Sequence, residues 1–229
     1  MMDVLGQLGA VSRAVRTEEI DGEPAAVQTL EQTYPSPIAD VWDAVTSPER
    51  IARWFMPVSG ELQLGGTYQL EGNAGGTVLE CSPPAGDSAS YRVTWEFGGG
   101  VTWLTIRLAA EGEGTRLELE HVAREADVPA EMAAMFGPGA TGVGWDGGLL
   151  GLSRHLTGSG AAGMDPEALA AWTATEEGRS FYRGAADAWA QASIADGTDA
   201  ATARAQADAT YGFYTGTTGE PEDGAEAQA

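Results

Sequence analysis

The side chains best suited to bind a small molecule or move a proton lie in the middle of the sequence. His121 alternates in phase with Leu117 and Leu119, which predicts that its imidazole faces the interior. There it could donate or accept a proton at a ligand carbonyl or phenol. The alternative is a structural histidine bonded to backbone or water. Tyr68 could orient a ligand with its hydroxyl, and Arg53 could pair an acidic ligand or stay solvated.

Large apolar residues accompany these polar candidates. Pockets for small molecules are mostly apolar, with a few placed polar groups, so the pattern predicts a ligand cavity. The same side chains could instead fill a solid core, and the sequence leaves both possibilities open. The candidate ligand-binding residues are Trp54, Phe55, Tyr68, Trp95, Phe97, Leu119, His121, Met135, Trp145, Leu149 and Leu152, with Met132 and Phe136 beside them.

Other reactive groups lack the context that chemistry would need. The only cysteine, Cys81, ends a predicted strand, which favours a small buried hydrophobe over a reactive thiol. Two histidines 34 positions apart, His121 and His155, form no recognisable metal site. The glycines of residues 137–142 match a dinucleotide expression, but no strand precedes them. We therefore expect no metal, no cofactor and no assigned catalytic residue.

One helix is expected to organise these groups. Trp145, Leu149, Leu152 and Leu156 recur at the spacing of one helical face. The segment 145–156 would form a rod roughly 18 Å long, which is long enough to lie across a sheet. Two glycines inside it, at 147 and 148, remove side-chain volume and suggest that another group approaches the helix closely there. The glycine-rich run 137–144 before it is expected to be flexible or tightly turned.

Period-two alternation predicts the sheet. Apolar and charged residues alternate over 90–97, 101–109 and 114–122, as expected for an antiparallel sheet that is wet on one side. Shorter strands are expected at 60–64, 67–71 and 76–81, with glycine turns between them. Two further strands, 10–18 and 25–34, flank a hairpin signal at Asp21–Gly22.

The remaining segments are predicted to be helical. Short helices are expected at 38–45 and from Pro48, with Ser47 as N-cap, and another near 129–136. Helices at 176–195 and 199–214 form a hairpin too small to be stable alone, which should dock on the sheet or on a second copy. The expected divisions are an arm and first strand (1–24), a sheet domain (25–157), a helical extension (164–215) and a disordered acidic tail (216–229).

Composition limits the partners. The 34 acidic and 12 basic residues give a net charge of −22, a surface that repels nucleic acid unless a basic patch exists, and none is apparent. The surface could serve solubility or attract a basic partner. No apolar run is long enough for a membrane span. The N-terminus does not look like a signal peptide, and one cysteine excludes an intrachain disulfide, so we expect a cytoplasmic protein.

The order of elements and several motifs resemble a known superfamily. The run Trp42-Asp-Ala-Val-Thr-Ser-Pro-Glu-Arg50 with Trp54-Phe55 resembles the START-like, or SRPBCC, superfamily. More narrowly, it resembles bacterial homologues of the activator of the ninety-kilodalton heat-shock chaperone ATPase. Segments 65–68, 91–95, 114–121 and 144–145 continue the match, over roughly residues 25–157. The resemblance implies an α+β helix-grip fold, a curved antiparallel sheet around a C-terminal helix, with a hydrophobic cavity between them.

Three functions follow as hypotheses. The first is a domain that holds a small hydrophobic or aromatic ligand between the sheet and the C-terminal helix, oriented by Tyr68 and His121. The second is a co-chaperone-type interaction module, with a protein partner or a homodimer formed through the C-terminal helices. The third is an enzyme of cyclase or dehydratase type that uses His121 as acid or base; no second catalytic group is evident beside it.

Overall fold

The computed structural model describes residues 4–20, 22–158 and 166–217. Eight strands form one antiparallel sheet in the order β1-β2-β8-β7-β6-β5-β4-β3. The strands are β1 (Ser12–Ile20), β2 (Glu23–Tyr34), β3 (Val58–Gly60), β4 (Thr67–Leu70), β5 (Gly75–Ala85), β6 (Ser88–Phe97), β7 (Gly100–Glu111) and β8 (Gly114–Arg124).

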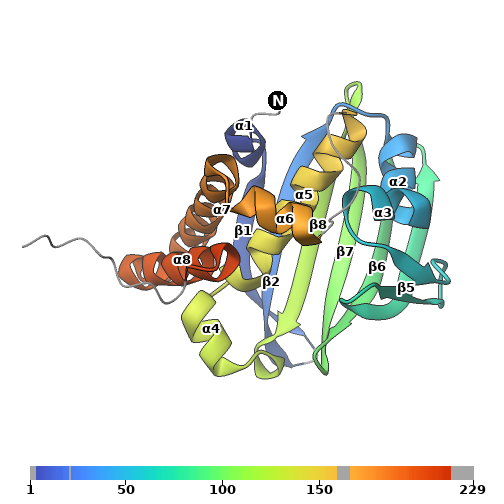
Figure 1. Ribbon diagram of the computed structural model, residues 1–229. Helices are drawn as coiled ribbons and strands as arrows, with labels where there is room; N and C mark the ends of the chain where they lie inside the picture. The colour runs from blue at the N-terminus through green and yellow to red at the C-terminus, as the bar shows by residue number, and fades with distance from the viewer. Residues whose placement is uncertain (1–3, 21, 159–165, 218–229) are drawn as a thin grey trace, which may run out of the picture.

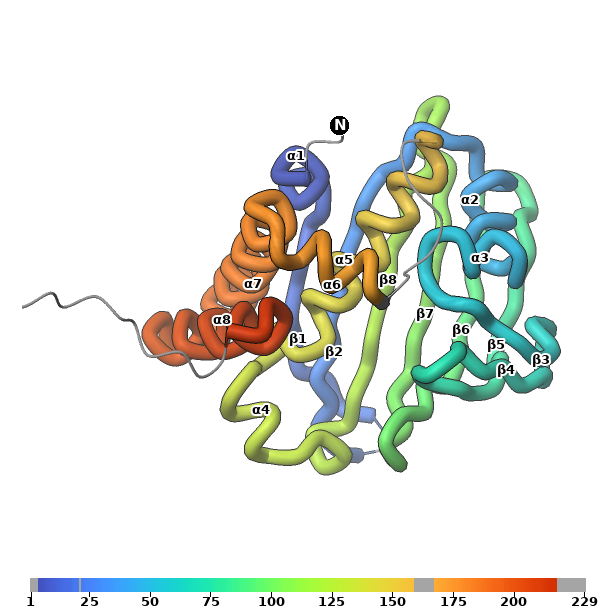
Figure 2. The backbone as a smooth tube through the Cα atoms, viewed as in Figure 1, coloured from blue at the N-terminus to red at the C-terminus, as the bar shows by residue number. Residues whose placement is uncertain are grey.

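Helices cover one face of this sheet (Figure 1). They are α1 (Val4–Gly9), α2 (Ile38–Thr46), α3 (Pro48–Trp54), α4 (Ala130–Phe136), α5 (Gly139–Leu156), α6 (Pro166–Thr173), α7 (Glu176–Ala195) and α8 (Ala200–Thr215), with a 3₁₀ turn at Glu125–Asp127. Helix α5 crosses in front of β2 and β8, while α2 and α3 stand over the other half of the sheet (Figure 2). The predicted α+β architecture, a curved sheet with a helix held against it, is confirmed.

The alternation of the long strands explains why one face is covered. Leu104, Ile106, Leu117 and Leu119 point to the helices and are buried. On the opposite face, Arg107 pairs with the carboxylates that flank Leu119, over 2.6 Å to Glu118 and 2.9 Å to Glu120. A strand with one apolar and one charged side needs cover on only one face.

Strand β5 carries two register shifts against β6, between Val78 and Glu80 and between Ser82 and Ala85. Irregularities of this kind bend a strand and increase its twist. Cys81 and its cross-strand partner Tyr91 lie between the two shifts. The bend therefore lies where the sheet faces α2 and α3.

Two predictions about segment boundaries were wrong. The strand expected at 60–64 is the shorter β3, Val58–Gly60, because the chain then turns at Gly65, which has φ of 78°. The organising helix begins at Gly139 instead of Trp145, so it is about 27 Å long. Its glycine-rich first half is helical because α7 and α8 pack against it. A Cβ at Gly142 would lie 2.3 Å from Cε2 of Trp189.

Other element predictions are confirmed. The β1–β2 hairpin forms with Gly22 at φ of 83°; Asp21 lies outside the described residues. The short helix before α5 and both helices of the C-terminal hairpin are present. The hairpin docks on its own chain, with α7 packed on α5, β1 and α1. The predicted tail lies outside the described residues from 218 onward. Ser47 occupies the N-cap of α3, but its hydroxyl bonds to Glu49 instead of a backbone N–H.

Candidate functional site

A cavity of about 130 Å³ lies between the sheet, α5 and α3 and is partly open to solvent. Strands β3 to β8 provide its floor, and α5 and the α2–α3 corner provide its roof. Within the described part of the chain, no charged side chain belongs to its wall. The lining residues are Val45, Thr46, Ile51, Trp54, Phe55, Val58, Leu62, Tyr68, Leu70, Val78, Cys81, Tyr91, Val93, Trp95, Leu104, Ile106, Leu117, Leu119, Trp145, Gly148, Leu149 and Leu152.

Eight of the eleven candidate residues meet at this cavity: Trp54, Phe55, Tyr68, Trp95, Leu119, Trp145, Leu149 and Leu152. Their rings form a continuous aromatic wall. Trp145 stacks on Phe55, with ring centroids 6.4 Å apart, and meets Trp95 edge-on at 4.9 Å. Phe55 also contacts Trp54, at 5.5 Å. Such ring pairs favour one arrangement over others, so this side of the cavity has a defined shape.

Two of the remaining candidates lie away from the cavity. Phe97 is 63% exposed and Met135 is 55% exposed, and neither lines the cavity. Phe97 is in phase with Trp95, but β6 ends there at the turn of Gly98 and Gly99, beyond the helical cover. Met135 and its neighbour Met132 lie on the solvent side of α4. The assignments of Phe97, Met132 and Met135 to the cavity were wrong. The assignment of Phe136 was wrong as well, because its ring packs near Phe213, at 5.5 Å, and does not line the cavity.

His121 faces the interior, as its alternation with Leu119 predicts, but it does not line the cavity. Its ring lies edge-on to Trp145 at 5.5 Å, and its Nε2 is 2.8 Å from Oγ1 of Thr102. Burial lowers the pKa of His121 to about 4. A neutral imidazole bonded to Thr102 behind Trp145 has the geometry of a structural histidine. Arg53 is exposed and also stands outside the cavity wall.

Several polar groups in the cavity wall are satisfied by the chain's own carbonyls. The Thr46 hydroxyl donates to Trp42 O over 2.7 Å. The Trp54 indole donates to Ala44 O over 2.9 Å. The Tyr68 hydroxyl donates to Thr94 O over 2.6 Å, and desolvation raises the pKa of its phenol. These bonds hold the side chains in place and leave their donors occupied.

Two other polar groups of the wall have no such partner. The Trp145 Nε1–H is buried without a hydrogen bond to any described residue. Tyr91 makes no hydrogen bond within the described chain either, although it remains partly accessible. Sequence reasoning did not select Tyr91 as a site residue. Its alternation with Trp95 on the same strand was a signal that could have done so.

The glycines of α5 serve backbone packing more than cavity space. A Cβ at Gly151 would lie 2.3 Å from Trp54 O, so α3 and α5 approach closely there. Gly148 borders Phe55 at an ordinary 3.7 Å, and Gly147 has nothing within 4 Å. The close approach inferred from residues 147 and 148 therefore occurs at Gly151, one turn later.

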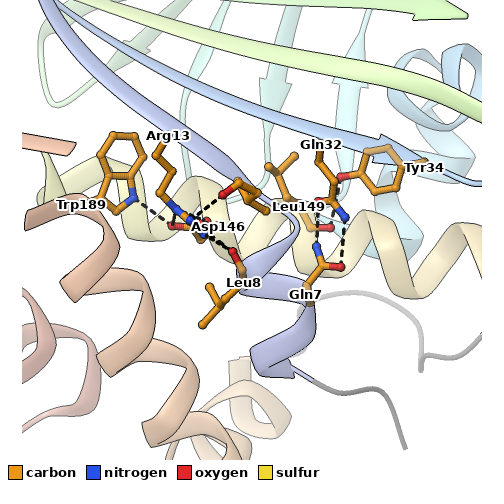
Figure 3. A network of polar contacts seen from close by, with 9 residues as sticks. Gln7, Leu8, Arg13, Gln32, Tyr34, Asp146, Leu149 and Trp189 are labelled. Carbon is orange, nitrogen blue, oxygen red and sulfur yellow. Dashed lines mark hydrogen bonds and ion pairs between the residues drawn. The ribbon is translucent and has the colours of Figure 1, made fainter. Parts of the chain in front are cut away.

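The far side of α5 is anchored by a buried ion pair (Figure 3). Arg13 of β1 approaches Asp146 with Nη2 and Oδ1 2.6 Å apart, and the two side chains are 6% and 0% exposed. Trp189 of α7 donates to the other carboxylate oxygen over 2.9 Å. Burial raises the pKa of Asp146, and the Arg13 and Trp189 hydrogen bonds oppose that rise. The helix that roofs the cavity is thus fixed from behind by β1 and α7.

Neighbouring hydrogen bonds extend this anchorage, as Figure 3 also shows. Gln7 and Gln32 bond reciprocally over 2.8 and 3.1 Å, and the Tyr34 hydroxyl donates to Leu149 O over 3.4 Å. Two kinds of site are not found among the described residues. No cluster of His, Cys, Asp or Glu there could hold a metal ion, and no described helix is long and apolar enough to cross a membrane.

Comparison with known proteins gives the family. Residues 35–156 match the family model of the activator of Hsp90 ATPase homolog 1-like proteins. The crystal structure of CalU16 from Micromonospora echinospora is 32% identical, with a TM-score of 0.54, and the match covers 75% of this chain and 96% of that one. The solution NMR structure of CalU16, also 32% identical, has a TM-score of 0.65, with 82% and 97% covered.

A more distant solved structure is that of protein MLL2253 from Mesorhizobium loti, which is 19% identical with a TM-score of 0.48, covering 58% of this chain and 98% of that one. No functionally curated protein matches the sequence. The family model spans more than half of the chain, including α2, α3 and α5, which enclose the cavity. The chain therefore belongs to the family of activator of Hsp90 ATPase homolog 1-like proteins, within the START-like superfamily.

Proposed function

We propose that the protein binds a small, neutral, apolar or aromatic molecule in the cavity beneath α5. The observation that carries this proposal is the cavity of about 130 Å³ with its apolar and aromatic wall. An engineered cavity of about 150 Å³ lined by similar side chains in another protein stays dry and binds benzene. The size therefore fits a single six-membered ring, or a short aliphatic group of equal volume.

The charge of the ligand follows from the wall. No acidic or basic side chain of the described residues lines the cavity, and transferring an unpaired charge into such surroundings is strongly unfavourable. We therefore propose a neutral ligand, oriented by the aromatic wall of Trp54, Phe55, Trp95 and Trp145. The predicted role of His121 in orienting the ligand together with Tyr68 is not part of this proposal, since its imidazole contacts Trp145 and does not line the cavity.

The test is a titration with toluene followed by NMR and by the fluorescence of the cavity tryptophans. Toluene should bind saturably, whereas benzoate and benzylammonium, which have similar size and a charge, should not. Val93→Phe fills the cavity and should abolish binding, and thermal unfolding checks that this variant folds. Trp145→Ala enlarges the cavity and should shift the preference toward naphthalene. Equal binding of toluene by wild type and Val93→Phe would contradict the proposal.

A second candidate function, contact with a protein, is favoured by an exposed apolar patch formed by Met132, Met135 and Phe213. Their side chains are 43%, 55% and 58% exposed. Helix α4, which carries the two methionines, packs on α8, which carries Phe213, and the rings of Phe136 and Phe213 lie 5.5 Å apart. Solvent-exposed groups of this kind often mark interaction sites. If the patch forms a homodimer, self-association should increase with salt, because screening weakens the repulsion between the acidic surfaces. It should disappear in Phe213→Glu. A protein that stays monomeric under all conditions would exclude the homodimer.

A further inference from the structure

The hydroxyl of Tyr91 has properties that the rest of the cavity wall lacks. Tyr91 lies deep in the protein, where desolvation raises the pKa of its phenol, yet part of its surface remains accessible. Tyr91 lines the cavity, and its hydroxyl is not among the unpartnered polar atoms that are sealed from solvent. The hydroxyl is also without a hydrogen bond to any described residue.

Buried tyrosine hydroxyls ordinarily find a partner, because an unsatisfied polar group costs free energy. The neighbouring hydroxyls follow this rule, since Tyr68 bonds to Thr94 O and Thr46 to Trp42 O. A phenylalanine would give the same packing at position 91 without that cost. The free hydroxyl therefore indicates a partner that comes from outside the chain.

The ring of Tyr91 is held in a fixed place. Its backbone is paired on both sides, opposite Cys81 of β5 and Ile106 of β7. Trp42 of α2 packs edge-on against the ring, with centroids 6.1 Å apart. The Trp145 N–H is the other unpartnered donor of the wall, but it is sealed by surrounding atoms. A ligand could reach the Tyr91 hydroxyl without moving the wall, whereas reaching the Trp145 N–H would require the ring to shift.

We propose that Tyr91 is the specificity-determining residue of the cavity and that its hydroxyl hydrogen-bonds one polar atom of the ligand. The proposal rests on the ligand-binding function above and narrows it. The ligand class becomes a single neutral ring, or an aliphatic group of that size, that carries one hydroxyl or carbonyl oxygen. Phenols and aryl ketones are the simplest members of the class.

Phenol and toluene test this assignment, because they differ by a hydroxyl in place of a methyl group. Their dissociation constants would be measured by NMR titration for wild type, Tyr91→Phe and Tyr34→Phe. Loss of one hydrogen bond corresponds to roughly fivefold in affinity. Tyr91→Phe should therefore weaken phenol relative to toluene by about fivefold. Tyr34→Phe also removes a phenol hydroxyl, but Tyr34 does not line the cavity, so the phenol-to-toluene ratio should stay at the wild-type value.

The outcomes separate the two proposals. If toluene and phenol both bind and Tyr91→Phe leaves their ratio unchanged, the Tyr91 assignment is wrong and the ligand-binding function stands. If neither ligand binds the wild type, the ligand-binding function itself fails.

Thermal unfolding gives a further readout. Tyr91→Phe should not lower the melting temperature, since no internal hydrogen bond is lost, whereas a clear decrease would indicate a structural role for the hydroxyl and overturn the assignment.

Discussion

The indole N–H of Trp189 donates a hydrogen bond to Oδ2 of Asp146 over 2.9 Å. This bond joins α7 to the face of α5 opposite the cavity. The same carboxylate accepts hydrogen bonds from the guanidinium of Arg13 in β1. The position of Trp145, and with it the cavity wall, therefore depends on residues that are far away in the sequence.

Breaking the buried ion pair should be strongly destabilising. Arg13→Met would leave Asp146 as an uncompensated buried charge, and removal of one partner from such a pair costs about 3 kcal/mol or more. Urea denaturation would measure the change. The double variant Arg13→Met/Asp146→Leu removes both charges and should recover much of the loss. A single variant as stable as the wild type would show that the pair does not hold α5 in place.

Two glycines of α5 should respond in opposite directions to alanine. In Gly142→Ala the new Cβ would lie 2.3 Å from Cε2 of Trp189, and overpacking of this kind costs about 1–3 kcal/mol. Gly147 has open space around it, so Gly147→Ala should stabilise the helix by up to about 1 kcal/mol. Chemical denaturation of the two variants provides a matched comparison. Equal effects would mean that helix propensity, and not contact with α7, governs both positions.

Stability should fall in acid partly because of His121. Burial lowers the pKa of His121 from 6.5 to about 4 in the folded protein, so the unfolded chain takes up the proton first as the pH falls. The contribution of neutral His121 to the free energy of unfolding is fully present above pH 6.5. It is lost progressively as the pH falls toward 4, to a limit of about 3 kcal/mol. Comparing urea denaturation of wild type and His121→Gln across this range isolates the contribution. An unchanged pH dependence in the variant would mean that the pKa of His121 does not differ between the folded and unfolded states.

Much of the sheet could be predicted from sequence because period-two alternation reports directly which strand face is covered. The same alternation predicted that Phe97 faces the interior together with Trp95. This prediction was wrong, because alternation does not reveal where the covering helices end. The first half of α5 was missed for a related reason. Residues 139–144 are poor helix formers by themselves, and they are helical because Trp189 and Thr210 pack against Gly142 and Gly139. No local pattern contains these contacts.

The cavity was only partly predictable. Trp54, Trp145 and Leu149 could be selected because large apolar residues in phase must face the interior. Whether they enclose a space or fill it depends on the bend of β5 and on the close approach at Gly151, which are three-dimensional properties. The free hydroxyl of Tyr91 could not be predicted from the sequence either, because a missing hydrogen bond is visible only once every neighbour has been placed.

Intermolecular nuclear Overhauser effects would show directly whether a small apolar ligand binds in the cavity beneath α5. With toluene present, we expect contacts from its ring and methyl protons to Tyr91, Trp145, Leu149 and Leu152, which line the cavity. Contacts confined to Met135 and Phe213 on the exposed patch, or no contacts at all, would contradict it.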